Sequence, residues 1–175
     1  LAQFTLHSSW VLYNTFKFGW GPAQNGWSLM AVGVMSVIVQ GFLLKHLLKR
    51  FSPRGLAAFS LIASMCTYFG FGLASEGWMM YVVIIIGTLL GGGAAAALQG
   101  LVSSAADATT QGQTMGSVAS LNSLMATIAP LIAAPLLAMV SHLPKGDWRI
   151  GLPFYFCAAL QGIGASIAFV HFRRH

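Results

Sequence analysis

The uncharged stretch from residue 77 to residue 106 limits the possible folds more than any other feature. It lies between Glu76 and Asp107 and contains no Asp, Glu, Lys, Arg or His. It also has no polar face before Gln99, whereas a helix at the surface of a soluble protein needs one. At 1.5 Å per residue, a helix of this length crosses the roughly 30 Å hydrocarbon core of a bilayer. The stretch therefore predicts a transmembrane helix.

The composition of the whole chain agrees with a membrane location. Hydrophobic residues make up 57% of the sequence and charged residues 7%, against roughly 25% charged residues in soluble domains. A soluble protein with so few charges could not cover its surface. The net charge of +6 does not point to nucleic acid here, because the basic residues fall in the connections between apolar runs. The expected partner is the lipid bilayer, with no nucleic acid bound.

The other apolar runs predict an all-α, polytopic membrane protein. We expect five complete transmembrane helices and one partial helix, and the short alternating strands of a barrel are absent. The first run is shorter than the roughly twenty residues that a span needs, so it is interpreted as the second half of a helix. The expected spans are residues 1–13 (partial), 26–44, 55–74, 78–102, 115–140 and 150–170.

The charged and aromatic residues predict the orientation of these spans. Alternate connections place six basic residues on one side: Lys45, Lys49, Arg50, Arg54, Arg173 and Arg174. The other side has three: Lys17, Lys145 and Arg149. Because cytoplasmic loops are richer in Lys and Arg, the C-terminus is expected in the cytoplasm. The tryptophans should then form a belt at the outer interface: Trp10, Trp20, Trp27, Trp78 and Trp148.

No Asp, Glu, Lys or Arg lies inside an expected span. Intramembrane charges commonly mark proton relays, so this chain by itself offers no obvious proton carrier. His7 is the exception among ionisable groups, and it lies near Gln3 and Ser8 in the partial helix. Its imidazole could face a water-filled cavity, or it could form a hydrogen bond between helices near the outer interface.

The span 115–140 carries the most polar surface. Its hydroxyl residues recur at helical spacing, a pattern that either lines a cavity or lets helices approach closely: Ser117, Ser120, Ser123 and Thr127. Asn122 lies beside this stripe, and Pro130 and Pro135 should bend the outer half of the helix. Gln40 and Gln99 lie near the cytoplasmic ends of their spans, as cavity residues or as interfacial polar groups.

The sequence contains no pattern typical of an enzyme. No nucleophile, base and acid recur at a catalytic spacing, and neither a phosphate-binding glycine loop nor a metal-ligand cluster is present. Cys66 and Cys157 fall in apolar runs and are expected to be small buried residues without a disulfide or metal. Gly87 and Gly91 form a small-xxx-small pattern that favours helix packing. We therefore predict no catalytic residue, no metal site and no enzymatic activity.

Short motifs give the chain a family resemblance along almost its whole length. These are Lys17-Phe18-Gly19-Trp20, Gly26-Trp27-Ser28-Leu29, Gln40, Ser75-Glu76-Gly77-Trp78, Leu98-Gln99-Gly100, Gln111-Gly112-Gln113, Gly116-Ser117 and Pro130-Leu131. In this order the chain resembles the C-terminal half of a major facilitator superfamily transporter, of the tetracycline-efflux type of drug–proton antiporter. The resemblance departs at Ser64, where those exporters carry an aspartate, and at Ser36, where some carry a histidine.

The resemblance implies the last half of a twelve-helix transporter, with residues 1–175 as one C-terminal unit. Its seventh, eighth, tenth and eleventh helices would line the central cavity. The candidate cavity residues are Gln3, His7, Ser36, Gln40, Gln99, Ser120 and Asn122.

The implied function is proton-coupled efflux of small drug-like compounds, with tetracycline as one candidate, across the bacterial inner membrane by alternating access. The N-terminal half of the same transporter would be the partner and would supply the titrating carboxylates. The proton gradient would provide the energy, without a cofactor. Two alternatives remain: an uptake or metabolite transporter of the same fold, and a truncated membrane protein that does not transport.

Overall fold

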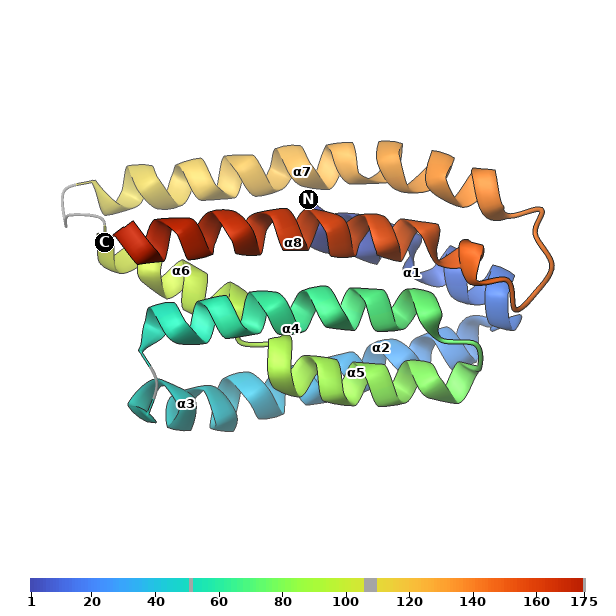
Figure 1. Cartoon of the computed structure of the whole chain (residues 1–175), viewed down its shortest axis with the longest axis horizontal. Coiled ribbons are helices and arrows are strands. Elements are labelled where there is room, and N and C mark those ends of the chain that lie inside the picture. Colours follow the sequence, from blue (N-terminus) through green and yellow to red (C-terminus); the bar gives the residue numbers. More distant parts are fainter. Residues whose placement is uncertain (51, 106–109, 175) are drawn as a thin grey trace.

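The computed structural model describes residues 1–50, 52–105 and 110–174, and every regular element among them is helical (Figure 1). In chain order the elements are α1 (Ala2–Phe18), α2 (Pro22–Ile38), η1 (Val39–Leu43, a π-helix), α3 (Leu44–Arg50), α4 (Pro53–Leu73), α5 (Gly77–Gly91), α6 (Ala94–Ala105), α7 (Gln111–Val140), η2 (Trp148–Gly151, a 3₁₀ helix) and α8 (Leu152–Arg174). Five helical segments in this part of the chain are long and apolar enough to cross a membrane. The predicted all-α membrane fold is confirmed.

Several helices extend beyond the ends expected from the sequence. Helix α1 continues to Phe18, and α2, η1 and α3 follow one another without a gap from Pro22 to Arg50. Most of the expected basic loop after Leu44 is therefore helical, because Lys and Arg are good helix formers. Helix α4 then begins with Pro53 in its first turn, and the Ser52 side chain accepts a hydrogen bond from the Gly55 N–H at 3.1 Å.

The uncharged stretch after Glu76 is not one uninterrupted helix. Helix α5 ends at Gly91 and α6 begins at Ala94, although the two together remain long enough to span. Consecutive glycines lose the most conformational entropy in a helix, so the run Gly91-Gly92-Gly93 is the weakest point. The Gly92 N–H still donates to the Thr88 carbonyl at 2.8 Å, which leaves this backbone donor satisfied inside the span.

Helix α4 lies at the centre of the bundle, where it packs against α5, α6 and α8. Glycines permit the close approach. A Cβ on Gly91 would lie 2.7 Å from Ser64 Oγ and 3.0 Å from the Ser64 N, and a Cβ on Gly87 would overlap Thr67. The predicted packing role of Gly87 and Gly91 is confirmed, since both contact α4.

The C-terminal end of α4 is held by α1. Tyr13 Oη donates to the Phe71 carbonyl at 2.8 Å, and Lys17 Nζ donates to the Gly72 carbonyl at 2.9 Å. Lys17 Nζ also lies 3.0 Å from Tyr13 Oη, and this lysine is only 4% exposed. The last carbonyls of a helix have no partner within it, so Tyr13 and Lys17, one turn apart, satisfy two of them and join the two helices.

A second polar contact lies in the connection between α7 and α8. The Asp147 carboxylate accepts hydrogen bonds from the Arg149 N–H at 2.9 Å and from the Arg149 guanidinium at 2.8 Å. The hydrogen bonds from the Arg149 side chain and backbone hold the pKa of Asp147 below its ordinary value. They also fix the start of the short helix η2.

The tryptophans do not all behave as interfacial residues. Trp27, Trp78 and Trp148 are more than 60% exposed, as an interfacial belt requires. Trp10 is instead buried among Phe71 and Phe154, and its Nε1 donates to Ser28 Oγ at 3.0 Å. Trp20 is also buried, at 9% exposed, in the same core cluster. Trp10 and Trp20 therefore pack inside the protein and do not form the exposed belt that the sequence predicted.

The contact between α4 and α5 predicts that two glycine substitutions will affect stability differently. Gly91→Ala should lower the thermal stability of the full-length protein by about 1–3 kcal/mol, because the new methyl group meets the rigid Ser64 backbone. Gly100→Ala is the matched control, because nothing lies within 4 Å of its Cβ position, and it should be neutral or stabilising. Thermal unfolding in detergent measures both, and equal melting temperatures would contradict this packing.

The hydrogen bonds from Tyr13 and Lys17 to the end of α4, here called the α1–α4 clamp, predict that replacing two different lysines will change the stability unequally. Lys17→Met keeps the length of the side chain but removes the donor to the Gly72 carbonyl, so the loss should be about 1–3 kcal/mol. Lys145→Met, an exposed lysine in the connection between α7 and α8, should change stability little. The comparison uses the same unfolding measurement, and a stable Lys17→Met protein would argue against the clamp.

Candidate functional site

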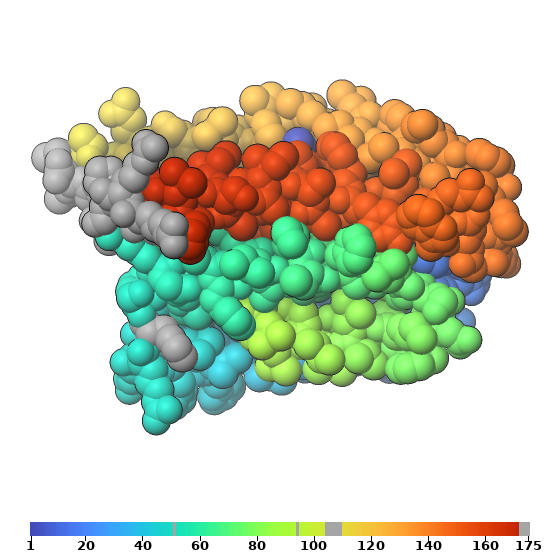
Figure 2. Space-filling view, in the orientation of Figure 1, coloured from blue at the N-terminus to red at the C-terminus, as the bar shows by residue number. Residues whose placement is uncertain are grey.

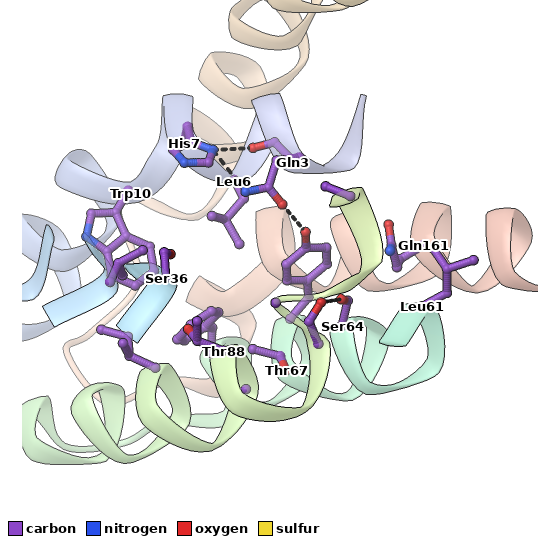
Figure 3. A pocket seen from close by; sticks show the side chains of 18 of the residues that line it. Gln3, Leu6, His7, Trp10, Ser36, Leu61, Ser64, Thr67, Thr88 and Gln161 are labelled. Carbon is purple, nitrogen blue, oxygen red and sulfur yellow. Dashed lines mark hydrogen bonds between the residues drawn. The ribbon is translucent and has the colours of Figure 1, made fainter. Parts of the chain in front are cut away.

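A cavity of about 450 Å³ opens within the bundle (Figure 3). Its walls come from α1, α2, η1, α4, α5, α6 and α8. Apolar side chains such as Leu6, Leu29 and Ile84 form much of the wall, with a few hydrogen-bonding groups among them. None of the described residues that line the cavity is Asp, Glu, Lys or Arg. Such a cavity suits a ligand with an apolar body and several uncharged or charge-balanced polar groups.

The main polar cluster of the cavity joins α1 to α4. His7 Nδ1 lies 2.7 Å from the Gln3 carbonyl oxygen. Because a carbonyl can only accept, this contact places the proton on Nδ1 and leaves Nε2 as an acceptor in the neutral ring. Tyr68 Oη donates to Gln3 Oε1 at 2.5 Å and so orients the amide. Figure 3 shows Gln3 and His7 together on one wall, with Thr67 and Thr88 across from them.

Ser36 and Gln40 line the same cavity from the continuous helical segment Pro22–Arg50. Ser36 lies in α2, whereas Gln40 lies in the π-helical segment η1. A π-helical turn widens the helix and is frequent at functional sites. Four of the candidate residues, Gln3, His7, Ser36 and Gln40, are thus brought together around one space.

Three candidate residues do not line this cavity. Gln99 is exposed on α6 beside Leu98, which does line it, and Ser120 and Asn122 are exposed on α7. The resemblance implied that the eleventh helix, which corresponds to α7, would contribute to the cavity. In the described part of the chain α4 and α8 contribute instead.

The hydroxyl stripe of α7 has no packing partner among the described helices. Each hydroxyl donates to the carbonyl four residues earlier, at 2.9–3.1 Å, and each side chain is exposed. These are Ser117, Ser120, Ser123 and Thr127. The stripe therefore satisfies its polar atoms within α7 and remains uncovered by the rest of this chain.

Sequence reasoning missed several residues of the cavity. Tyr68, Thr88 and Gln161 line it, and none was a candidate. A signal was present in α4, where Ser60, Ser64, Thr67 and Tyr68 give one face hydroxyl groups at helical spacing. Ser64 and Thr67 line the cavity, and Ser64 Oγ donates to the Ser60 carbonyl at 2.8 Å.

Comparison with known proteins connects this architecture to transporters. A sequence profile described as Major Facilitator Superfamily matches residues 1–175. The chain is 34% identical over 147 residues to the class D tetracycline resistance protein of Salmonella ordonez, a match covering 83% of this chain and 37% of that protein. It is 32% identical over 150 residues to the class B protein of Escherichia coli, covering 83% and 36%.

A third relative, the class E tetracycline resistance protein of Escherichia coli, is 30% identical over 152 residues, covering 86% of this chain and 37% of the relative. No solved structure matches the chain significantly. The chain spans about 37% of the length of the curated relatives it matches. The helical membrane fold agrees with the profile match over the whole chain, and this match shows that the chain belongs to the Major Facilitator Superfamily.

Proposed function

We propose that this chain is the C-terminal half of a proton-driven exporter of small, amphipathic drug-like compounds, with tetracycline as a leading candidate. The observation that supports this most is the uncharged, hydrogen-bonding cavity, whose polar groups come from α1, α2, η1, α4, α5 and α8. The names of the relatives, which refer to tetracycline resistance, support the substrate class. Tetracyclines offer an apolar ring system edged with polar groups, which matches such a lining.

The proposed mechanism is alternating access around this cavity in the bacterial inner membrane, with the C-terminus in the cytoplasm. The N-terminal half of the transporter would close the other side of the site. His7 Nε2 would accept a hydrogen bond from the substrate, and the Gln3 amide, oriented by Tyr68, would recognise a second polar group. These contacts are uncharged, so the binding energy would come mainly from burial of the apolar part of the substrate.

The proton-coupling groups in this proposal belong to the N-terminal half. The described residues that line the cavity include no carboxylate, and Ser64 stands in α4 where the resembling exporters carry an aspartate. The proton gradient supplies the energy, no cofactor takes part, and no bond of the substrate is made or broken. The protein therefore acts as a transporter and not as an enzyme.

Everted membrane vesicles containing the full-length protein test the proposed direction and energy source. When respiration acidifies the vesicle interior, labelled tetracycline should accumulate inside several-fold above vesicles without the protein, and a protonophore should abolish the accumulation. Accumulation only in right-side-out vesicles would indicate an uptake transporter. Movement of neither tetracycline nor a panel of amphipathic drugs would leave a non-transporting membrane protein.

The Gln3–Tyr68 contact predicts a specific effect on transport. Tyr68→Phe removes the donor that orients the Gln3 amide, so the KM for the exported drug should rise about 5–10-fold, as expected for one lost hydrogen bond. Tyr155→Phe is the matched control, because Tyr155 Oη donates to the Trp148 carbonyl outside the cavity. An unchanged KM in Tyr68→Phe, with normal expression, would show that the Gln3–Tyr68 contact does not take part in substrate binding.

A further inference from the structure

A second concave surface lies outside the cavity, along the seam between α4 and α5. It is an apolar groove of about 380 Å³ lined by these two helices. The two helices run side by side on the face shown in Figure 2. Both lie within segments long and apolar enough to cross a membrane, so the groove lies at the depth of the hydrocarbon core.

Glycines hollow out this groove and large side chains form its rims. Gly70 and Gly87 carry no side chain at the seam, where a Cβ on Gly70 would lie 3.3 Å from Val83. The rims are large and about half exposed: Phe59 54%, Ile62 52%, Ile86 52% and Leu90 47%. Thr67 is the one hydroxyl residue of the lining, and its Oγ1 already donates to the Ala63 carbonyl at 2.8 Å. The groove therefore favours an apolar occupant.

The shape favours a flexible chain over another helix. Helices associate in membranes through small residues and polar groups that let their backbones approach closely, whereas bulky side chains form the rims of this groove. From Phe59 to Gly70 the groove follows α4 for about 16 Å at 1.5 Å per residue. That length accommodates much of a lipid acyl chain lying along the membrane normal.

One end of the groove lies beside a basic segment. Phe59 and Leu90 line the end nearer the start of α4, and α3 contacts α4 there. Figure 1 places α3 next to this end of the two helices. Three exposed basic residues occur in α3: Lys45, Lys49 and Arg50. The acidic residues in the described part of the chain are Glu76 and Asp147. Glu76 follows the C-terminal end of α4, away from α3, and Asp147 follows the C-terminal end of α7.

We propose that the α4–α5 groove binds an anionic phospholipid. One acyl chain lies between Phe59 and Gly70, and the phosphate lies against the basic residues of α3. The two parts of the lipid match the two parts of the surface: an apolar groove at membrane depth and positive charge at the cytoplasmic interface, where anionic lipids attract Lys and Arg. Of the residues that line this groove, Thr67 and Gly87 also line the cavity, and the others belong to the groove alone.

Photo-crosslinking of the full-length protein in nanodiscs tests the site directly. The probes are phosphatidylglycerol and phosphatidylcholine with the same diazirine-bearing acyl chain, and mass spectrometry locates the adducts. Phosphatidylglycerol adducts should concentrate on residues 59–70 and 82–90 and exceed those on the exposed α2 residues 29–38 several-fold. Adducts spread evenly over all exposed faces would show ordinary solvating lipid and overturn the proposal.

Two variants separate the groove from the headgroup contact. Cys66→Phe places a ring in the groove, where Cys66 is exposed, and should abolish the concentration of adducts. Val37→Phe, at a position of α2 that is 67% exposed, is its control and should leave the pattern unchanged.

Replacing Lys45, Lys49 and Arg50 with Gln tests the headgroup contact. It should remove the preference for phosphatidylglycerol, so that the ratio of phosphatidylglycerol to phosphatidylcholine adducts falls by roughly an order of magnitude or more at low salt. Equal labelling by the two lipids in the unmodified protein would refute the anionic specificity.

Discussion

Hydrocarbon offers no hydrogen bonds, so each backbone donor and acceptor inside the membrane must find its partner within the protein. Much of the structure follows from this constraint. At the C-terminal end of α4, Tyr13 and Lys17 supply donors to the Phe71 and Gly72 carbonyls. At the break after α5, the Gly92 N–H keeps its bond to the Thr88 carbonyl. The exposed hydroxyls of α7 likewise bond to their own helix.

The same constraint explains where irregular backbone is found. The π-helical segment η1 and the break between α5 and α6 are neighbours in space, because a Cβ on Gly93 would lie 3.4 Å from Leu44, directly after η1. Both segments border the cavity, through Gln40 and through Gly91 and Gly92. Non-regular backbone is tolerated at membrane depth where it lines a cavity or is buried in protein. The cavity and the two irregular segments therefore form one structural unit.

The sequence predicts the membrane fold well because length and apolarity determine a span. Each expected span overlaps a helical segment, although the span 78–102 is divided between α5 and α6. Prediction from the sequence fails where the structure depends on which residues the fold brings together in space. Lys45 to Arg50 continue a helix because their helix propensity outweighs the polar pattern of a loop. Trp10 packs in the core, and Tyr68 reaches Gln3 across 65 residues of chain. Gln3, His7, Ser36 and Gln40 share a cavity, but spacing alone could not separate them from Gln99, Ser120 and Asn122, which lie outside it.

The central claim is that the cavity opens alternately to each side of the membrane. It is tested most directly by measuring whether a reagent can reach position 7 from each side. The measurement uses His7→Cys in a full-length protein from which the exposed Cys66 has been removed. A membrane-impermeant maleimide should label it from either side, and the exported drug should slow both reactions. Labelling from one side only, unchanged by drug or proton gradient, would contradict alternating access and leave a static cavity.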